Sequence, residues 1–179
     1  MRVAIIGAGV TGLLTAIEIA EAVPAAAIVV YEARHPGGGS TGLSAGLFTG
    51  AGYAQEDQTE WRRYGAGRLR ALAAEGALGL RRCGFLRVAL SEVAYDAQVE
   101  MGRRALVNGL DVEVVDIARI GELLPRYRLD GVRGGLWSPN DGYVDGTELC
   151  GTLAERAQAA GVRIVRAAVR GLERGAAGR

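Results

Sequence analysis

The chain has 179 residues, 49% of them hydrophobic, and its 21 basic residues nearly balance its 20 acidic ones. This length suffices for an ordinary domain with a buried core, and the near-neutral charge argues against nucleic acid as the main partner. All the basic residues are arginines scattered among acids, so we interpret them as solvated surface. No run of about 20 apolar residues occurs, so we expect no membrane span, with the cytoplasm as the default location.

The cysteine and histidine content gives no metal-site pattern. Cys83 and Cys150 lie far apart and form no CxxC motif, so both are predicted to be small buried thiols. His35 is the only histidine, which argues against a dedicated metal centre. We therefore expect no metal.

The first part of the chain has the pattern of a strand, a helix and a second strand. Residues 2–6 form a short β-branched run ended by glycine, which predicts a buried strand. Residues 10–22 have helical apolar spacing and are followed by Pro24, and residues 27–31 read as another buried strand. Such a unit places its two strands parallel, with a right-handed crossover.

A glycine- and serine-rich stretch follows, RHPGGGSTGLSAGLFTGAGY, from Arg34 to Tyr53. One interpretation is a flexible linker. Leu43, Leu47 and Phe48 interrupt the polar run, however, and apolar residues have no use in a linker. The favoured interpretation is a backbone held close to a ligand.

The rest of the chain predicts further helices and short strands. The predicted helices are residues 60–80, 93–107, 120–125 and 147–160, and the predicted strands are residues 84–90, 111–116, 162–169 and the start of 132–145. Trp61, Tyr64, Leu69 and Leu72 are interpreted as core. Asp141 and Asp145 are interpreted as turn residues. This order predicts a nucleotide-binding domain interrupted by a partly antiparallel module.

The glycines after the first strand carry the strongest functional signal. Gly7-Ala8-Gly9-Val10-Thr11-Gly12 fits GxGxxG, and Glu32 ends the next strand 20 residues after Gly12. Gly7 permits the tight turn, Gly9 lets a pyrophosphate reach the backbone, and Gly12 lets the helix pack close to the strand.

The chemistry of this corner predicts a dinucleotide. The exposed N–H groups and the positive helix end hold a diphosphate, while Glu32 accepts hydrogen bonds from ribose hydroxyls and repels a 2′-phosphate. The alternative is a glycine turn without a ligand. Between NAD and FAD, the second glycine-rich stretch favours FAD, because it could run past the diphosphate and under a flavin ring.

At these residues the sequence resembles the D-amino acid oxidase superfamily of FAD-dependent oxidoreductases, and within it the glycine oxidase and sarcosine oxidase-like branch. The matching pieces are IIGAGVTGLLTAIEIA, VVYEA, GGGSTGLSAGLF, GFLRVAL and GGLWSPNDGYVDGTELCGTLAERAQAAGVRI. The resemblance implies an α/β fold: a Rossmann-type, GR2-like FAD-binding domain interrupted by the start of a mixed or antiparallel substrate domain. Family members are considerably longer, so the C-terminal part is missing by comparison. The implied domains are an incomplete FAD-binding domain at residues 1–82 and 143–179 and the beginning of a substrate domain at residues 83–142.

The resemblance also implies a set of FAD contacts. They comprise Gly7, Gly9, Val10, Thr11, Gly12, Ser40 and Thr41 at the diphosphate, Glu32 at the adenosine ribose with Ala33 and Arg34 beside it, Ser44, Ala45, Gly46 and Leu47 toward the isoalloxazine, and Val169 at the adenine. Arg34 is equally interpretable as a solvated residue. His35 is interpreted as an ordinary loop residue and not as a flavin attachment point. Gly146 stands where the family often has proline. No catalytic residue is assigned.

The implied activity is oxidation of an amino acid or small amine by hydride transfer to flavin N5. Two alternatives stay open: oxidation of a 2-hydroxy acid or glycerol 3-phosphate on the same fold, and an inactive or partner-completed FAD-binding module. The expected partner is a small-molecule substrate, and a homo-oligomer or a second subunit supplying the missing half is a further option. The electron acceptor, oxygen or another, is open.

Overall fold

The computed structural model describes residues 1–49, 64–65, 67–68, 71, 73–74 and 79–173. The chain divides into two compact units: unit 1 comprises Met1–Gly46, Ala77–Gly79 and Val144–Arg179, and unit 2 comprises Leu47–Gly76 and Leu80–Tyr143. The predicted domain limits, residues 1–82 with 143–179 and residues 83–142, stay a prediction. Most of the predicted helix at 60–80, with Trp61, Leu69 and Leu72, lies outside the described residues.

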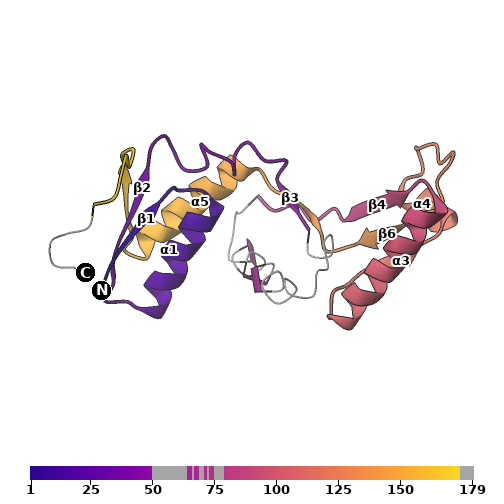
Figure 1. Ribbon diagram of the computed structural model, residues 1–179, viewed down its shortest axis with the longest axis horizontal. Helices are drawn as coiled ribbons and strands as arrows, with labels where there is room; N and C mark the ends of the chain where they lie inside the picture. Colours follow the sequence, from indigo (N-terminus) through magenta and orange to yellow (C-terminus); the bar gives the residue numbers. More distant parts are fainter. Residues whose placement is uncertain (50–63, 66, 69–70, 72, 75–78, 174–179) are drawn as a thin grey trace. The chain divides into compact units, whose positions relative to one another are not determined.

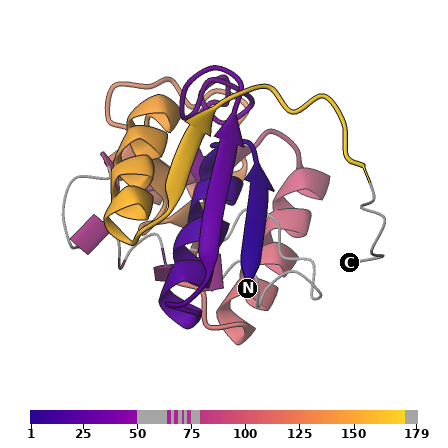
Figure 2. The same cartoon turned by 90° about the vertical axis from the view of Figure 1, so that its left-hand side faces the viewer.

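Unit 1 is built on a parallel sheet of three strands. The strands β1 (Arg2–Ile6), β2 (Ala27–Glu32) and β8 (Arg163–Arg166) lie side by side in the order β1-β2-β8. Helix α1 (Val10–Ala22) connects β1 to β2, and α5 (Gly146–Ala159) leads into β8. Figure 2 shows the three arrows pointing the same way with both helices behind them. The predicted strand–helix–strand unit is confirmed.

The core of unit 1 lies between the sheet and these two helices, which also pack against each other. Ile28 and Val30 of β2 are buried on this side, and the register pairs Val30 with Ile5 of β1. The helices contribute buried aliphatic side chains, namely Leu13, Ala16 and Ile17 from α1 and Leu149, Leu153, Ala154 and Ala157 from α5. Residues two apart in a strand share a face, so this pattern fixes which side chains face the helices.

The opposite face of the same sheet is apolar and open. The alternate residues Ala4, Ile6, Val29 and Tyr31 lie on it, and Ile6 is 59% exposed. A hollow of about 560 Å³ lines it, with Ala4, Val29 and Tyr31 among its walls. Parallel sheets are normally covered on both faces. Within the described part of unit 1, helices cover only one.

Unit 2 is antiparallel, as predicted. Its main sheet has the order β4-β6-β5, formed by β4 (Phe85–Ala89), β6 (Gly134–Ser138) and β5 (Glu113–Val115). A two-stranded ladder pairs β3 (Leu47–Phe48) with β7 (Gly142–Tyr143). The unit also contains helices α3 (Glu92–Val107) and α4 (Ile117–Leu123) (Figure 1).

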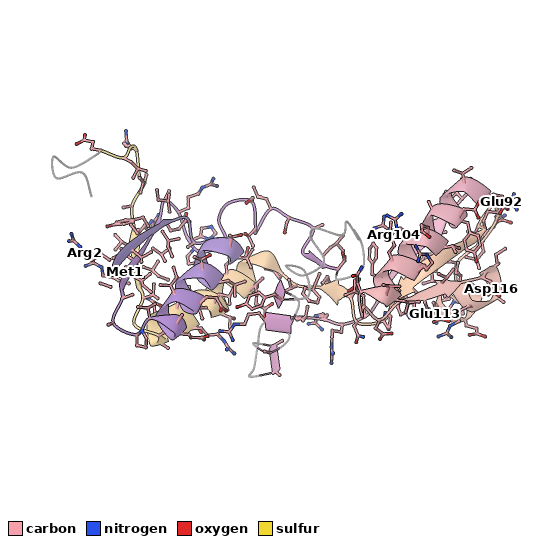
Figure 3. All side chains as sticks on the ribbon, turned by 60° about the horizontal axis from the view of Figure 1, so that its bottom comes forward. Met1, Arg2, Glu92, Arg104, Glu113 and Asp116 are labelled. Atoms are coloured by element: carbon pink, nitrogen blue, oxygen red, sulfur yellow. The ribbon has the colours of Figure 1, made fainter. Side chains whose placement is uncertain are left out.

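Helix α3 packs closely on this sheet because it carries a glycine at the contact. A Cβ atom added to Gly102 would lie 2.7 Å from the Val114 side chain and 2.9 Å from that of Leu136. Ser91 caps the helix by accepting from the Ala94 N–H at 3.2 Å. Glu92 and Arg104 lie at opposite ends of α3 (Figure 3), each matching the sign that the helix dipole favours there.

The turn predicted at the end of β6 has two functions in the fold. The buried Asp141 accepts a hydrogen bond from the Gly84 N–H through its backbone carbonyl at 2.8 Å. Asp145 is the N-cap of α5, where its Oδ1 accepts from the Thr147 and Glu148 N–H groups at 2.8 and 2.9 Å. Both aspartates therefore serve the backbone, in line with the interpretation as turn residues.

One burial prediction is confirmed and two are wrong. Tyr64, which was expected in the core, is 59% exposed. Cys150 is fully buried on α5, whereas Cys83 is exposed. Cys83 precedes β4, between Arg82 and Gly84, outside the repeating pattern that places a side chain in a core. In the described part of the chain, no helix combines the length and hydropathy needed to cross a bilayer. The same residues contain no cluster of three or more metal-ligating side chains.

Candidate functional site

The glycine loop that follows β1 is shaped by its first and last glycines. Gly7 has a φ of +99°, in the left-handed region that favours glycine, and its N–H donates to the Tyr31 carbonyl of β2 at 2.8 Å. A Cβ atom on Gly12 would collide with the Gly7 carbonyl oxygen and approach Ile5 to 3.3 Å. Gly7 therefore makes the turn, and Gly12 lets α1 approach β1.

Ala8, the residue between the first two glycines, forms hydrogen bonds through both its N–H and its carbonyl. The Ala8 N–H donates to Glu32 Oε2 at 2.8 Å, and the Ala8 carbonyl accepts from the Gly37 N–H at 2.9 Å. Ala8 is fully buried. The loop is thus held between the end of β2 and the start of the second glycine-rich stretch.

Glu32 also accepts from the Arg34 N–H, through Oε1 at 2.8 Å. Desolvation by burial, the largest single influence, raises the pKa of Glu32, but hydrogen bonds from the backbones of Ala8, Arg34 and Ala33, with the charge of Arg34, bring it below its ordinary value. The carboxylate is therefore ionised at neutral pH. A carboxylate has about four lone-pair sites, so acceptor capacity is left for hydroxyl groups of a ligand.

The N-terminus of α1 carries several backbone donors. Its N-cap, Gly9, provides no side-chain cap, and the first N–H to receive a partner is that of Val10, which donates to Thr41 Oγ1 at 3.2 Å. Among the described residues, the structure gives no protein acceptor for the N–H groups of Gly9, Thr11 and Gly12. Unpaired donors at the positive end of a helix form an anion site.

The first part of the second glycine-rich stretch, residues 34–44, is a series of turns in unit 1. Gly42 donates to the Gly37 carbonyl at 3.0 Å. Ser40 and Ala45 are exposed. Gly46 has a φ of +65° and lies so close to Val144 that a Cβ atom would collide with the Val144 carbonyl. Residues 34–46 of this stretch are therefore an ordered part of unit 1 and not a flexible linker.

Within this stretch, residues 42–46 read GLSAG and match G-x-S-x-G, a pattern of serine hydrolases that depends on a strand-to-helix turn. The serine lies instead in a run of turns, and its Oγ donates to the Thr41 carbonyl at 2.7 Å. Ser44 Oγ also accepts from the Gly46 N–H at 3.3 Å. The His35 ring pairs through Nδ1 with the Pro36 carbonyl at 3.0 Å. The surroundings of Ser44 therefore lack the strand-to-helix turn that the serine hydrolase pattern requires.

The structure brings together most, but not all, of the residues expected at one ligand. Gly7 to Gly12, Glu32 to Arg34 and Ser40 to Gly46 all belong to unit 1, whereas Leu47 belongs to β3 of unit 2. Val169 lies in the segment after β8 and is 39% exposed. The Ala167 N–H donates to the Glu32 carbonyl at 2.8 Å, so this segment leaves the sheet beside Glu32.

A cavity of about 250 Å³ adjoins the acid. It is lined by Glu32, Arg34, His35, Pro36, Ala154, Gln158, Ile164 and Arg166. The sequence reasoning did not identify the last four. Nothing local marks them, because α5 and β8 reach this edge only through the sheet order, more than 120 residues after Glu32.

These features define the class of the site. A parallel strand–helix–strand unit, a glycine turn with spare N–H donors at the helix start, and an ionised acid at the end of the second strand are the parts of a dinucleotide-binding domain. The position of the ligand follows from the fold, since open α/β sheets bind ligands beyond the carboxyl ends of their strands.

The family is shown by comparison with known proteins. The model of the DAO family, described as FAD dependent oxidoreductase, matches residues 2–179, and the chain belongs to this family. The predicted family and the predicted cofactor, FAD, are confirmed at this level.

Relatives within the family act on different substrates. The chain is 29% identical to L-2-hydroxyglutarate dehydrogenase of Salmonella houtenae over 164 residues, which is 90% of this chain and 38% of that protein. Glycine oxidase from Bacillus cereus ATCC 14579 is 26% identical with a TM-score of 0.75, covering 91% of this chain and 45% of that one. L-amino acid deaminase from Proteus myxofaciens shares the fold, with a TM-score of 0.87 at 22% identity, covering 97% of this chain and 40% of that one. The chain spans less than half the length of each of these proteins.

Proposed function

We propose that unit 1 of this chain binds FAD and forms the cofactor-binding part of an oxidoreductase acting on a small molecule. The observation that carries the proposal is the glycine loop: the N–H groups of Gly9, Thr11 and Gly12 have no protein acceptor among the described residues. Gly9 and Gly12 are half-buried and Thr11 is exposed. Backbone donors without partners at the positive end of a helix favour an anion, and a diphosphate would satisfy them.

The residues present fit FAD in charge as well as in shape. Glu32, ionised by its backbone hydrogen bonds, has acceptor capacity for the adenosine ribose hydroxyls and would repel a 2′-phosphate. The cavity lined by Glu32, Arg34 and Ile164 provides room beside the acid. The other FAD contacts implied by the family resemblance stay predictions: Ala33, Ser40, Ser44, Ala45, Gly46, Leu47 and Val169.

Bound FAD would supply the hydride acceptor, so the protein needs no strong acid or base of its own. The contribution of the described residues is to bind and orient the cofactor. The glycine turn and Glu32 hold one end of it, and the turns at residues 36–46 lie next along the chain.

For the whole protein we propose oxidation of an amino acid or small amine, as the name of the 26%-identical glycine oxidase suggests. A second candidate is oxidation of a 2-hydroxy acid, favoured by the 29%-identical L-2-hydroxyglutarate dehydrogenase. Both reactions remove a hydride from a carbon that bears an amine or a hydroxyl group. A third possibility is a module that binds FAD and acts only with a partner chain.

Titration of the purified chain with FAD and with FMN tests the proposal. FMN lacks both the diphosphate linkage and the adenosine, so we expect FAD to bind much more tightly. Equal affinity for the two flavins, or no binding of FAD, would overturn the proposal. A panel of amino acids and 2-hydroxy acids with a dye acceptor then separates the first two substrate classes, and a yellow but inactive chain would favour the third.

A further inference from the structure

One hydroxyl group, that of Thr41, lies against the start of α1. Thr41 Oγ1 accepts the Val10 N–H at 3.2 Å, across 31 residues of sequence. A Cβ atom added to Gly9 would lie 2.9 Å from the same oxygen, so this side chain also contacts the glycine loop. The second glycine-rich stretch thereby supplies the cap that α1 does not obtain from its own N-cap residue.

Thr41 is itself held from other directions. Burial raises the pKa of the Cys150 thiol, which is fully buried on α5, and the neighbouring Thr41 side chain offsets part of this rise. The Thr41 carbonyl accepts from Ser44 Oγ at 2.7 Å. Gly146, at the start of α5, lies so close to that carbonyl that a Cβ atom would collide with it. The close approach of this carbonyl explains why glycine suits position 146.

The bond to Val10 changes which donors remain for a ligand. The first four N–H groups of a helix have no partner within it. Here Val10 uses its N–H on Thr41, which leaves those of Gly9, Thr11 and Gly12. The expectation that the Val10 backbone contacts the diphosphate therefore loses its donor in this arrangement.

We infer that Thr41 is a positioning residue for the diphosphate site: its hydroxyl occupies the Val10 N–H and so aims the three remaining donors at the ligand. This inference rests on the proposed FAD binding. It assigns Thr41 a function toward the helix start and not the direct phosphate contact that the family resemblance implies.

Nuclear magnetic resonance of the ligand-free chain tests the first half of the inference. Thr41→Val keeps the shape of the side chain and removes its oxygen, so the Val10 amide should exchange with solvent about tenfold faster, as expected for loss of one hydrogen bond. Thr41→Ser should restore the slow exchange. Thr15→Val, the same substitution at an exposed position of α1, is the matched control and should change nothing.

Titrations of the same variants test the second half. Thr41→Val should weaken FAD and ADP about tenfold and leave adenosine, which has no phosphate, unchanged; a general loss of structure would weaken all three. If Thr41→Val does not fold, Thr41→Ala, which removes the same oxygen, replaces it in every measurement.

The outcomes separate the two proposals. Unchanged Val10 exchange in Thr41→Val overturns the inference, and so does faster exchange with unchanged FAD and ADP affinity. Unchanged Val10 exchange with weakened FAD would identify Thr41 as a direct phosphate ligand, which also overturns it. A wild-type chain that binds neither FAD nor ADP overturns the proposed function and, with it, the assignment of Thr41 to a ligand site.

Discussion

The carboxylate of Glu32 and the N–H of Ala8 are joined by a 2.8 Å hydrogen bond across 24 residues of sequence. The bond links the end of β2 to the middle of the glycine turn after β1. Glu32 is therefore part of the turn's structure as well as the predicted ribose contact. Substitutions at Glu32 should change both the turn and ligand affinity.

We expect Glu32→Gln to weaken FAD by about 1.5–3 kcal/mol, the usual cost of losing hydrogen bonds to a charged group. Ala8 and Arg34 donate to different oxygens of the carboxylate, and in glutamine one of these two positions becomes an NH₂ group, which cannot accept. Calorimetric titration with FAD measures the loss. Glu100→Gln is the control, since Glu100 is an exposed carboxylate of unit 2 bonded to Arg103 and Arg104; an equal effect in both variants would refute a specific function for Glu32.

The pKa of Glu32 predicts a pH dependence of stability. Its folded-state pKa lies below the ordinary value of 4.5, so ionised Glu32 stabilises the fold fully above that value, and this stabilisation is lost as the pH falls through the lower folded pKa. Urea unfolding of wild type and Glu32→Gln from pH 7 down to pH 3 measures it. The difference between the two proteins should shrink below about pH 4.5; a difference independent of pH would mean that the charge is not involved. Glu100, whose pKa is lowered to about 2 by Arg103 and Arg104, is present in both proteins and cancels.

We expect Gly9→Val to prevent FAD retention. Its side chain would begin 2.9 Å from Thr41 Oγ1, and it would occupy the approach of a diphosphate to the backbone. FAD affinity should fall by about 100-fold or more, or about 2.7 kcal/mol. Gly39→Val is the matched control, because a Cβ atom at Gly39 meets nothing within 4 Å. Undiminished flavin content of Gly9→Val would show that the diphosphate lies elsewhere.

A charged substitution should have different effects at two neighbouring isoleucines of β1, because their side chains lie on opposite faces of the sheet. Ile6→Lys places an ammonium group on the open sheet face, where Ile6 is 59% exposed, and should reduce self-association with little effect on stability. Ile5→Lys directs it toward α1, where Ile5 approaches Gly12, and should cost about 3 kcal/mol or more. Light scattering and urea unfolding measure the two effects. Equal destabilisation by both variants would contradict the assignment of the two faces.

The local features of this protein were predictable from sequence. The run of residues 2–6, the glycine fingerprint and the helix at residues 10–22 carry their own signals, because backbone freedom and side-chain periodicity are properties of neighbouring residues. The same signals placed Glu32 at the end of β2, and they extended to the antiparallel strands of unit 2.

The tertiary structure alone decided which distant groups meet. The pairing of Thr41 with Val10, the approach of Gly146 to Thr41, and the addition of Gln158 and Ile164 to the cavity beside Glu32 join segments between 31 and more than 130 residues apart. The exposure of Cys83 was likewise decided by the tertiary structure. A sequence pattern reports which face of an element is buried, but the partner on that face depends on sheet order and packing, which no local pattern encodes.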